Sequence, residues 1–451
     1  MLHKTQFWCK ISQRKSDLIL KPIPLILLSF LWLPCNHISG QSTQPNIIMI
    51  LADDIGPETL SVYGGQSYST PVLDAMAAKG VTFLNAYSMP SCTPTRVHFL
   101  SGRSNVRNYV YFSCMDPNER TFVQDLKNAG YRTGAAGKWQ LRGSQVYPEF
   151  YQQGLHPTDA GFEEWCLWQV DESGERYFDP LIETHQAPPT VRVGEYGPDI
   201  FNAFAIDFIE NHKSEPFFLY YPMVLGHGPF HTPPGRTPSS NIHINFGNML
   251  SYADQLIGNL AMKLEQLGIA DNTLVIFAGD NGTSQRVPSK WNGHYVYGGK
   301  GATSQFGLHA PLIAYWPNNT SPGSYDSDLL EFTDFYPTFL EMAGLDMPRD
   351  KIYDGISFLD RLKGTNSGKS RKHVYGWFWP KPDKVAQPAP RTWIVTDEWK
   401  LYGTGQFFHS VTDRLERRNL QFSANPIVVA ARNHCQALLD GYPSMPPAWG
   451  G

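Results

Sequence analysis

The sequence predicts an α/β fold in which a mainly parallel sheet is covered by helices on both faces. Short apolar runs at 46–51, 217–221 and 274–278 are typical of strands that are buried on both sides. Segments with apolar residues at helical spacing alternate with these runs, and such alternation builds a parallel sheet between two helical layers. With 451 residues, of which 41% are hydrophobic and 17% charged, the chain can bury a large core, which excludes a disordered protein.

The first forty residues predict an export signal. Five basic residues end at Lys21, an apolar run follows at 25–33, and Ile38-Ser39-Gly40 offers a passable cleavage site. The run is shorter than the roughly 20 apolar residues that cross a bilayer. We therefore expect a signal peptide at residues 1–40, an exported chain that is periplasmic or secreted, and no stable membrane insertion. A retained membrane anchor is the alternative.

The charge of the remaining chain excludes nucleic acid as a partner. The whole sequence has a formal net charge of −4, and without residues 1–40 it holds 32 basic against 40 acidic residues, a net charge of −8. Binding to nucleic acid depends on a positive surface that neutralises phosphates, and an acidic body lacks it.

Two amphipathic helices are expected between the buried runs. The segment 199–211 has helical spacing and leads into the strand at 217–221. A second helix carries Leu256, Leu260, Leu264 and Leu267, and Asp271-Asn272 supplies the turn before the strand at 274–278.

The pattern changes beyond about Gly364. A basic linker comes first and is followed by a proline-rich stretch at 380–390. Strand-like segments at 392–396 and 399–402 come next, and a helical segment lies near 430–439. We therefore expect one large three-layer α/β/α domain over residues 41–370 and a small C-terminal α+β domain with an antiparallel sheet over residues 371–451.

Acidic and amide side chains follow two of the buried strands. Asp53-Asp54 comes directly after the first run, and Asp280-Asn281 follows the run at 274–278. Ligands of open α/β sheets bind outside the carboxyl ends of the strands, so these oxygens are expected to converge there. Such an all-oxygen set suits Ca²⁺, with Mg²⁺ as the alternative ion. The simpler interpretation is a helix cap and an ordinary turn.

The segment from Ser91 to Gly102 predicts a helix whose start can hold an anion. Pro94 is expected at the first helical position and Gly102 at the end. Cys92 then lies where backbone N–H groups favour negative charge, and Arg96 lies about one turn further along the helix, within reach of that anion. The alternative for a single cysteine is a small buried hydrophobic residue.

The stretch Cys92-Thr93-Pro94-Thr95-Arg96 resembles the C-x-P-x-R signature of the formylglycine-dependent sulfatase family, of the alkaline-phosphatase-like superfamily. The resemblance extends from about Pro45 to Asn419. The further segments that carry it are Gly130–Trp139, His227-Gly228-Pro229, Lys300 with Ala310–Ile313, Asp334–Thr338, and Asp354-Gly355.

The resemblance implies a sulfuric ester hydrolase of the arylsulfatase type, with residues 41–370 as its catalytic domain. It implies that a maturation enzyme converts Cys92 to formylglycine, whose hydrate attacks sulfur. The implied Ca²⁺ ligands are Asp53, Asp54, Asp280, Asn281 and the modified Cys92. The implied partners of the sulfate group and the formylglycine are Arg96, Lys138, His227 and Lys300, with His227 suited to protonate the departing oxygen. Export and an aromatic content of 13% favour a sulfated carbohydrate, small or polymeric, as the substrate.

The chain departs from the family pattern at two places. Gln140 stands where the family commonly has a histidine that helps to deprotonate formylglycine, and an amide cannot accept a proton at neutral pH. The segment after Lys300 reads Gln305-Phe306-Gly307-Leu308-His309 and lacks a charged pair common in the family. Two alternative functions remain: a phosphonate or phosphate ester hydrolase of the same superfamily, and an inactive sulfatase-like binding protein.

Overall fold

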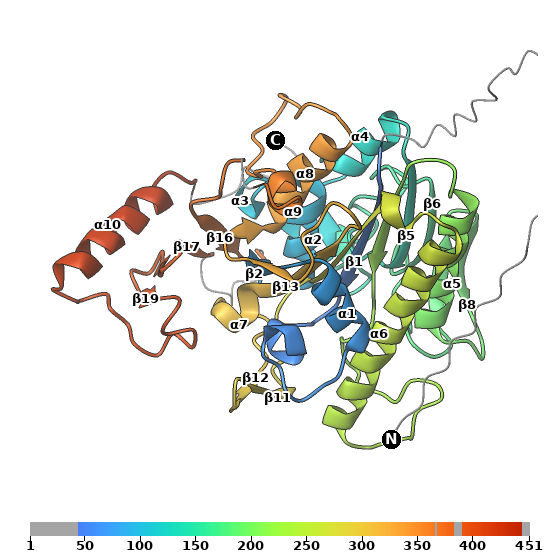
Figure 1. Ribbon diagram of the computed structural model, residues 1–451, viewed down its shortest axis with the longest axis horizontal. Helices are drawn as coiled ribbons and strands as arrows, with labels where there is room; N and C mark the ends of the chain where they lie inside the picture. Colours follow the sequence, from blue (N-terminus) through green and yellow to red (C-terminus); the bar gives the residue numbers. More distant parts are fainter. Residues whose placement is uncertain (1–43, 366–367, 383–389, 444–451) are drawn as a thin grey trace, which may run out of the picture. The chain divides into compact units, whose positions relative to one another are not determined.

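The computed structural model describes residues 44–365, 368–382 and 390–443 (Figure 1). Its main sheet has eleven strands in the order β14-β2-β13-β10-β1-β9-β5-β6-β7-β8, with β15 paired to β2. The strands of this sheet are β1 (Asn46–Ala52), β2 (Val81–Tyr87), β5 (Arg132–Lys138), β6 (Glu164–Trp168), β7 (Leu181–Thr184), β8 (Ala187–Val191), β9 (Phe217–Pro222), β10 (Thr273–Gly279), β13 (His309–Tyr315), β14 (Ser324–Asp326) and β15 (Leu330–Glu331). The predicted signal peptide lies outside the described residues.

The centre of the sheet is parallel, as the sequence predicts. Strand β1 pairs in parallel with β10 and β9, and β5 pairs in parallel with β9 and β6. All seven residues of β1 are buried, which explains its unbroken apolar sequence. Strand β13 runs antiparallel to both β10 and β2.

Helices cover both faces of the sheet because successive side chains of β1 point to opposite sides. Ile47, Met49 and Leu51 pack in one cluster with the helices α2, α4 and α8. Ile48 and Ile50 pack in a second cluster with α1, α5 and α6. The α-helices are α1 (Pro71–Lys79), α2 (Cys92–Ser101), α3 (Asn105–Asn108), α4 (Phe122–Asn128), α5 (Gly197–Asn211), α6 (Ile242–Gln266), α7 (Gln305–Leu308), α8 (Phe335–Met342), α9 (Leu359–Leu362) and α10 (Pro426–Leu439). The predicted three-layer fold is confirmed.

Short elements complete the described chain. The 3-10 helices are η1 (Pro57–Thr59), η2 (Ser61–Tyr63), η3 (Pro148–Phe150), η4 (Ala270–Asn272) and η5 (Phe332–Asp334). Two hairpins lie beside the main sheet, β3 (Tyr109–Tyr111) with β4 (Cys114–Met115), and β11 (Pro288–Trp291) with β12 (His294–Tyr297). Within the described ranges, no helix is both long and apolar enough to cross a bilayer.

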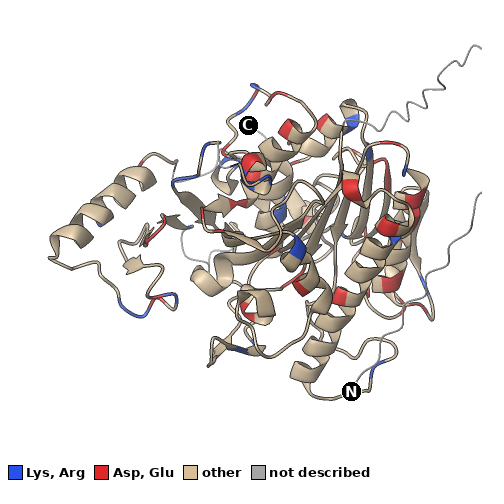
Figure 2. Ribbon diagram, in the orientation of Figure 1, with Lys and Arg blue, Asp and Glu red and all other residues tan. Residues whose placement is uncertain are grey.

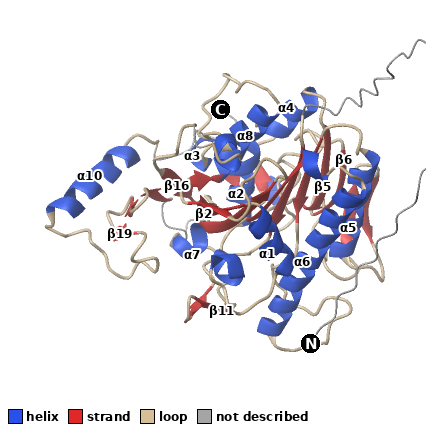
Figure 3. Cartoon of the chain, in the orientation of Figure 1, coloured by secondary structure: helices blue, strands red, loops and turns tan. Residues whose placement is uncertain are grey.

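The C-terminal part forms the small antiparallel sheet that the sequence predicts (Figure 3). Its strands are β16 (Val374–Phe378), β17 (Arg391–Val395), β18 (Trp399–Tyr402) and β19 (Phe407–His409). Trp377, Ile394 and Leu401 pack against Val428 and Cys435 of α10. On the other side of this sheet, Val374, Trp393 and Val395 share a hydrophobic cluster with Tyr87 and Leu308 of the large domain. The boundary at residue 370 therefore stays a prediction.

The excess of acidic residues in the sequence is visible on the helices. Acidic positions predominate along α5 and α6 (Figure 2). Helix α5 contains Asp199, Asp207 and Glu210 and no lysine or arginine.

Candidate active site

The site lies at the carboxyl ends of the central strands, where the sequence predicts it. Asp53 and Asp54 follow β1, and Asp280 and Asn281 follow β10. The register pairs Ala52 with Gly279, the last residues of these two parallel strands. The Asp280 N–H donates to Ala52 O at 2.9 Å, and the Asp54 N–H donates to the Asp280 carboxylate at 3.1 Å. Strand register therefore brings all four side chains together.

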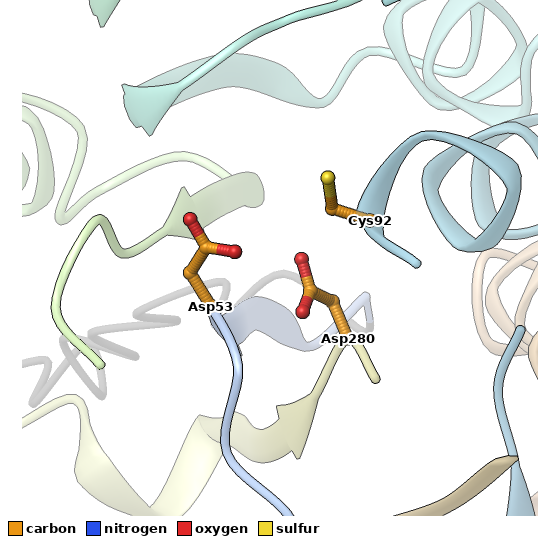
Figure 4. A group of neighbouring side chains, drawn as sticks. All are labelled: Asp53, Cys92 and Asp280. Carbon is orange, nitrogen blue, oxygen red and sulfur yellow. The ribbon is translucent and has the colours of Figure 1, made fainter. Parts of the chain in front are cut away.

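Cys92 enters the same space from the first residue of α2. Its Sγ and one carboxylate oxygen each from Asp53 and Asp280 all lie within 4.8 Å of one another. Figure 4 shows the three side chains converging from two strand ends and a helix. The helix begins two residues earlier than predicted, so that Pro94 is its third residue rather than its first. Proline is tolerated there because the N–H groups of a first helical turn have no partner within the helix.

Three cations and three acids form matched pairs in the site. Lys138 Nζ, at the end of β5, lies 2.7 Å from Asp53 Oδ2, and Lys300 Nζ lies 2.7 Å from the Asp54 carboxylate. The Arg96 guanidinium lies 3.1 Å from Asp280 Oδ2 and is completely buried. The predicted sulfate-binding cations therefore lie around the predicted metal ligands, and each is held by one acid.

The oxygen atoms of the site fit a hard cation. Asp53 Oδ1 and Asn281 Oδ1 are buried and have no hydrogen-bond partner among the described residues. Polar atoms buried without a partner are costly, so these oxygens fit the ligand shell of a cation. Together with Asp54 and Asp280 they form the all-oxygen set that Ca²⁺ or Mg²⁺ takes.

The carboxyl groups titrate abnormally because they are buried beside one another. Burial, followed by the charge of Asp53, raises the pKa of Asp280 to about 6. Burial also opposes ionisation of Asp53, but Lys138, His227 and Lys300 hold its pKa well below the ordinary value. One acid is thus fully ionised while its neighbour resists a second negative charge, and a bound cation would relieve that repulsion.

His227 lies over the same acids from the loop after β9. Its Nε2 is 3.9 Å from Asp54 Oδ2, and its Nδ1 is 2.6 Å from Gly228 O. The carbonyl accepts only from a protonated Nδ1, so the neutral ring presents an unprotonated Nε2 to the site. Burial lowers the pKa of His227 to about 4.

Gln140 contacts the cysteine directly. The Cys92 thiol donates to Gln140 Oε1 at 3.2 Å. Gln140 has a φ of 55°, in the left-handed region, two residues beyond Lys138. The structure therefore brings together every residue that the sequence analysis assigned to the site.

One arginine at the site was not predicted. Arg176, in the loop between β6 and β7, stacks over the Trp168 ring at 4.1 Å, and its NH1 is 3.7 Å from Asp53 Oδ2. It belongs to no sequence motif, and the tertiary course of a loop decides its position.

Comparisons with known proteins identify the family of this chain. The family model described as Sulfatase matches residues 45–345, and the model described as N-sulphoglucosamine sulphohydrolase, C-terminal, matches residues 295–420. The chain is 32% identical to N-acetylgalactosamine-6-sulfatase of Homo sapiens, over 81% of this chain and 75% of the relative.

Solved structures show the same fold at low identity. One, a protein in complex with its substrate D-glucosamine-2-N,6-O-disulfate, has a TM-score of 0.71 and 21% identity, over 88% of this chain and 97% of that one. The phosphonate monoester hydrolase of Agrobacterium radiobacter has a TM-score of 0.67 and 18% identity, over 88% and 95%. The family models and the relative confirm the resemblance that the motifs indicate. The chain belongs to the sulfatase family, whose members hydrolyse sulfuric esters.

Proposed function

We propose that this protein is an exported sulfatase that hydrolyses a sulfate monoester of a sulfated carbohydrate, using a formylglycine made from Cys92 and a bound Ca²⁺. The observation that carries the proposal is the position of Cys92, on the first turn of α2 and within 4.8 Å of carboxylate oxygens of Asp53 and Asp280. A buried structural cysteine has no need of two acids beside it.

The chain supplies a preformed cation site and a place for the nucleophile. Asp53, Asp54, Asp280 and Asn281 would hold Ca²⁺, which when bound polarises the sulfate oxygens and offsets their charge. Formylglycine at position 92 would supply, as its hydrate, the hydroxyl that attacks sulfur. Its maturation requires a separate enzyme as a transient partner.

The basic residues stabilise the charge of the sulfate group. Lys138 and Lys300 are held by Asp53 and Asp54, so their ammonium groups are oriented before the substrate arrives. Fixed charges that need not reorganise stabilise a transition state more than mobile ones do. Arg96 is buried behind them on Asp280, where it orients that carboxylate.

His227 is the residue placed to protonate the departing alcohol. The neutral ring has its proton on Nδ1, so the acid role requires a second proton on Nε2. A sulfate ester bound beside Nε2 adds negative charge and favours that protonation. Sugar alkoxides are poor leaving groups and need this proton.

The carbohydrate assignment rests on relatives and on the expected export. The human relative is named for a sulfated sugar, and a structure of the same fold holds a disulfated glucosamine as its substrate. Export through the predicted signal peptide would place the protein in the periplasm or outside the cell, where polymeric sulfated glycans are accessible.

Initial rates on a matched set of aryl esters test the proposal. A sulfate, a phosphate and a phosphonate with the same aryl group are compared in wild type and in Cys92→Ala. We expect sulfate hydrolysis that Cys92→Ala abolishes, whereas Cys166→Ala, which removes a buried cysteine on β6, retains it. Preference for the phosphate or phosphonate would establish the alternative hydrolase, and inactivity on all three esters would favour a binding protein.

A further inference from the structure

Arg176 is held at the site without a hydrogen-bonded carboxylate among the described residues. Its guanidinium stacks on the indole of Trp168, the last residue of β6, and the side chain is 16% exposed. The buried NH1 has no hydrogen-bond acceptor among the described residues. The nearest carboxylate oxygen, Asp53 Oδ2, is 3.7 Å away, which is too long for a hydrogen bond.

Comparable arginines of this chain do have carboxylate partners. Arg107, which is 18% exposed, contacts both oxygens of Asp354 at 2.9–3.1 Å. Arg361 donates to Asp326, and Arg371 donates to Asp334. Asp53 does not serve Arg176 in this way, because its Oδ2 accepts from Lys138 at 2.7 Å and lies 3.7 Å from the Arg176 guanidinium. Within the described residues of the site, Arg176 is thus a cation beyond the three matched pairs.

The position of Arg176 indicates which part of the substrate it can contact. The Arg176 side chain is 16% exposed, which lies between the buried Lys138 and Arg96, at 1% and 0%, and the more open Lys300 and His227, at 26% and 27%. The adjacent Tyr177 hydroxyl donates to the backbone carbonyls of Val224 and His227, which ties the loop to the side where the alcohol departs. Since His227 is the proposed acid for the alcohol, a group bound by Arg176 is expected on the alcohol part of the substrate.

We propose that Arg176 binds a second oxyanion of the substrate, a carboxylate or a second sulfate, near the sulfate ester that is cleaved. This inference rests on the proposed sulfatase function and narrows its substrate to acidic sugars. A planar guanidinium binds either oxyanion through two parallel hydrogen bonds, and stacking on Trp168 holds the plane in place.

The test compares three sugar sulfates that differ in one substituent. One carries a single sulfate, the second an additional sulfate, and the third a carboxylate; 4-nitrophenyl sulfate is the fourth substrate. We expect Arg176→Gln to lower kcat/KM about 10- to 100-fold for whichever doubly anionic sugar fits, and less than threefold for the other substrates. Arg176→Lys should restore part of the lost kcat/KM. The sugar whose hydrolysis is reduced, the disulfated or the carboxylated one, shows which oxyanion Arg176 binds.

Arg107→Gln is the matched control, because it removes an arginine of similar exposure from an established ion pair. It should lower Tm without changing the order of the substrates. Equal losses on all four substrates in Arg176→Gln, or no preference of wild type for either doubly anionic sugar, would overturn the proposal. If wild type hydrolyses no sulfate ester, the proposed function fails. The affinity of the disulfated sugar for wild type and for Arg176→Gln, measured by calorimetry, then still tests whether Arg176 binds an oxyanion.

Discussion

Gln140 stands where the resemblance to the sulfatase family leads us to expect a histidine. Its amide oxygen accepts from the Cys92 thiol at 3.2 Å, so its side chain is in direct contact with the expected nucleophile position. An amide fixes the geometry of that contact but takes up no proton at neutral pH. The proton that leaves the nucleophile must therefore pass to another group or to water.

We predict that Gln140→His accelerates release of sulfate from the enzyme. Proton transfer by a positioned side chain contributes about 10²–10⁴-fold, so even partial restoration should raise the single-turnover rate of this step about tenfold. Histidine is among the residues that tolerate a left-handed φ, which makes the substitution compatible with the backbone. A changed Tm with an unchanged rate would mean that position 140 only packs.

His227→Ala should act selectively on substrates with poor leaving groups. Nitrophenolate departs without a proton, whereas a sugar alkoxide needs one, so the loss should be about 10²–10⁴-fold larger for sugar sulfates. Rates for a series of aryl sulfates, plotted against the pKa of the leaving group, measure this dependence. Equal slopes for wild type and His227→Ala would remove His227 from the acid role.

At the scale of secondary structure elements, the small C-terminal sheet holds the loop that carries Lys300. Lys400 of β18 is completely buried, and its Nζ donates to Thr303 O and to Glu416 Oε1, the latter at 2.7 Å. The Tyr402 hydroxyl donates to the same Thr303 carbonyl at 2.8 Å. Burial lowers the pKa of Lys400 to about 8, which reflects the cost of keeping this cation inside the protein.

Lys400→Met should therefore destabilise the fold. Removing one partner of a fully buried ion pair costs about 3–5 kcal/mol, and the loss here should lie at or below the lower end of that range because Glu416 is only partly buried. The free energy of unfolding from denaturant titration measures the loss. Lys400→Met combined with Glu416→Leu should recover most of it, and a double variant that is no more stable than Lys400→Met would contradict this explanation.

The elements that the sequence predicts well are those with a strong local pattern. Buried strands such as β1 and amphipathic helices such as α6 can be predicted from periodicity alone. The predicted ends of the strands then indicate where the acidic side chains lie. The antiparallel course of β13 was not predicted, because an apolar strand has the same pattern in either direction. Pro94 misplaced the start of α2 for a different reason: proline is compatible with every position of a first helical turn.

The sequence predicts the site residues that belong to motifs. It does not predict a residue that only the tertiary fold brings to the site. The positions of Cys92, Asp53 and Asp280 follow from sequence motifs and strand ends. Arg176 reaches the site through a loop whose path depends on Trp168 and Tyr177, and no local pattern in residues 169–180 encodes that path.

At the scale of the whole molecule, binding of a cation at the proposed metal site should stabilise the folded chain. A cation that binds only the folded chain stabilises it by about 2.7 kcal/mol at a concentration 100 times its Kd. Chelation should lower Tm and abolish turnover, and Ca²⁺ or Mg²⁺ should restore both. Asp280→Ala should lose bound metal by elemental analysis, and full activity of a metal-free preparation would refute the metal site.

The cysteines give a second property of the whole chain. Cys114, Cys166 and Cys435 are buried and form no disulfide in the described ranges. If Cys92 is converted and the leader carries away Cys9 and Cys35, titration of the unfolded mature protein should find three thiols per chain. Four thiols would mean that Cys92 is unmodified, and one would mean that a disulfide has formed.

Mass spectrometry of the peptide that contains residues 92–96 shows whether position 92 carries the nucleophile as formylglycine. The protein is produced with and without the maturation enzyme, and conversion is measured beside sulfatase activity in each preparation. We expect an aldehyde in place of the thiol and activity in proportion to the fraction converted. A fully active preparation with an unmodified Cys92 would contradict it.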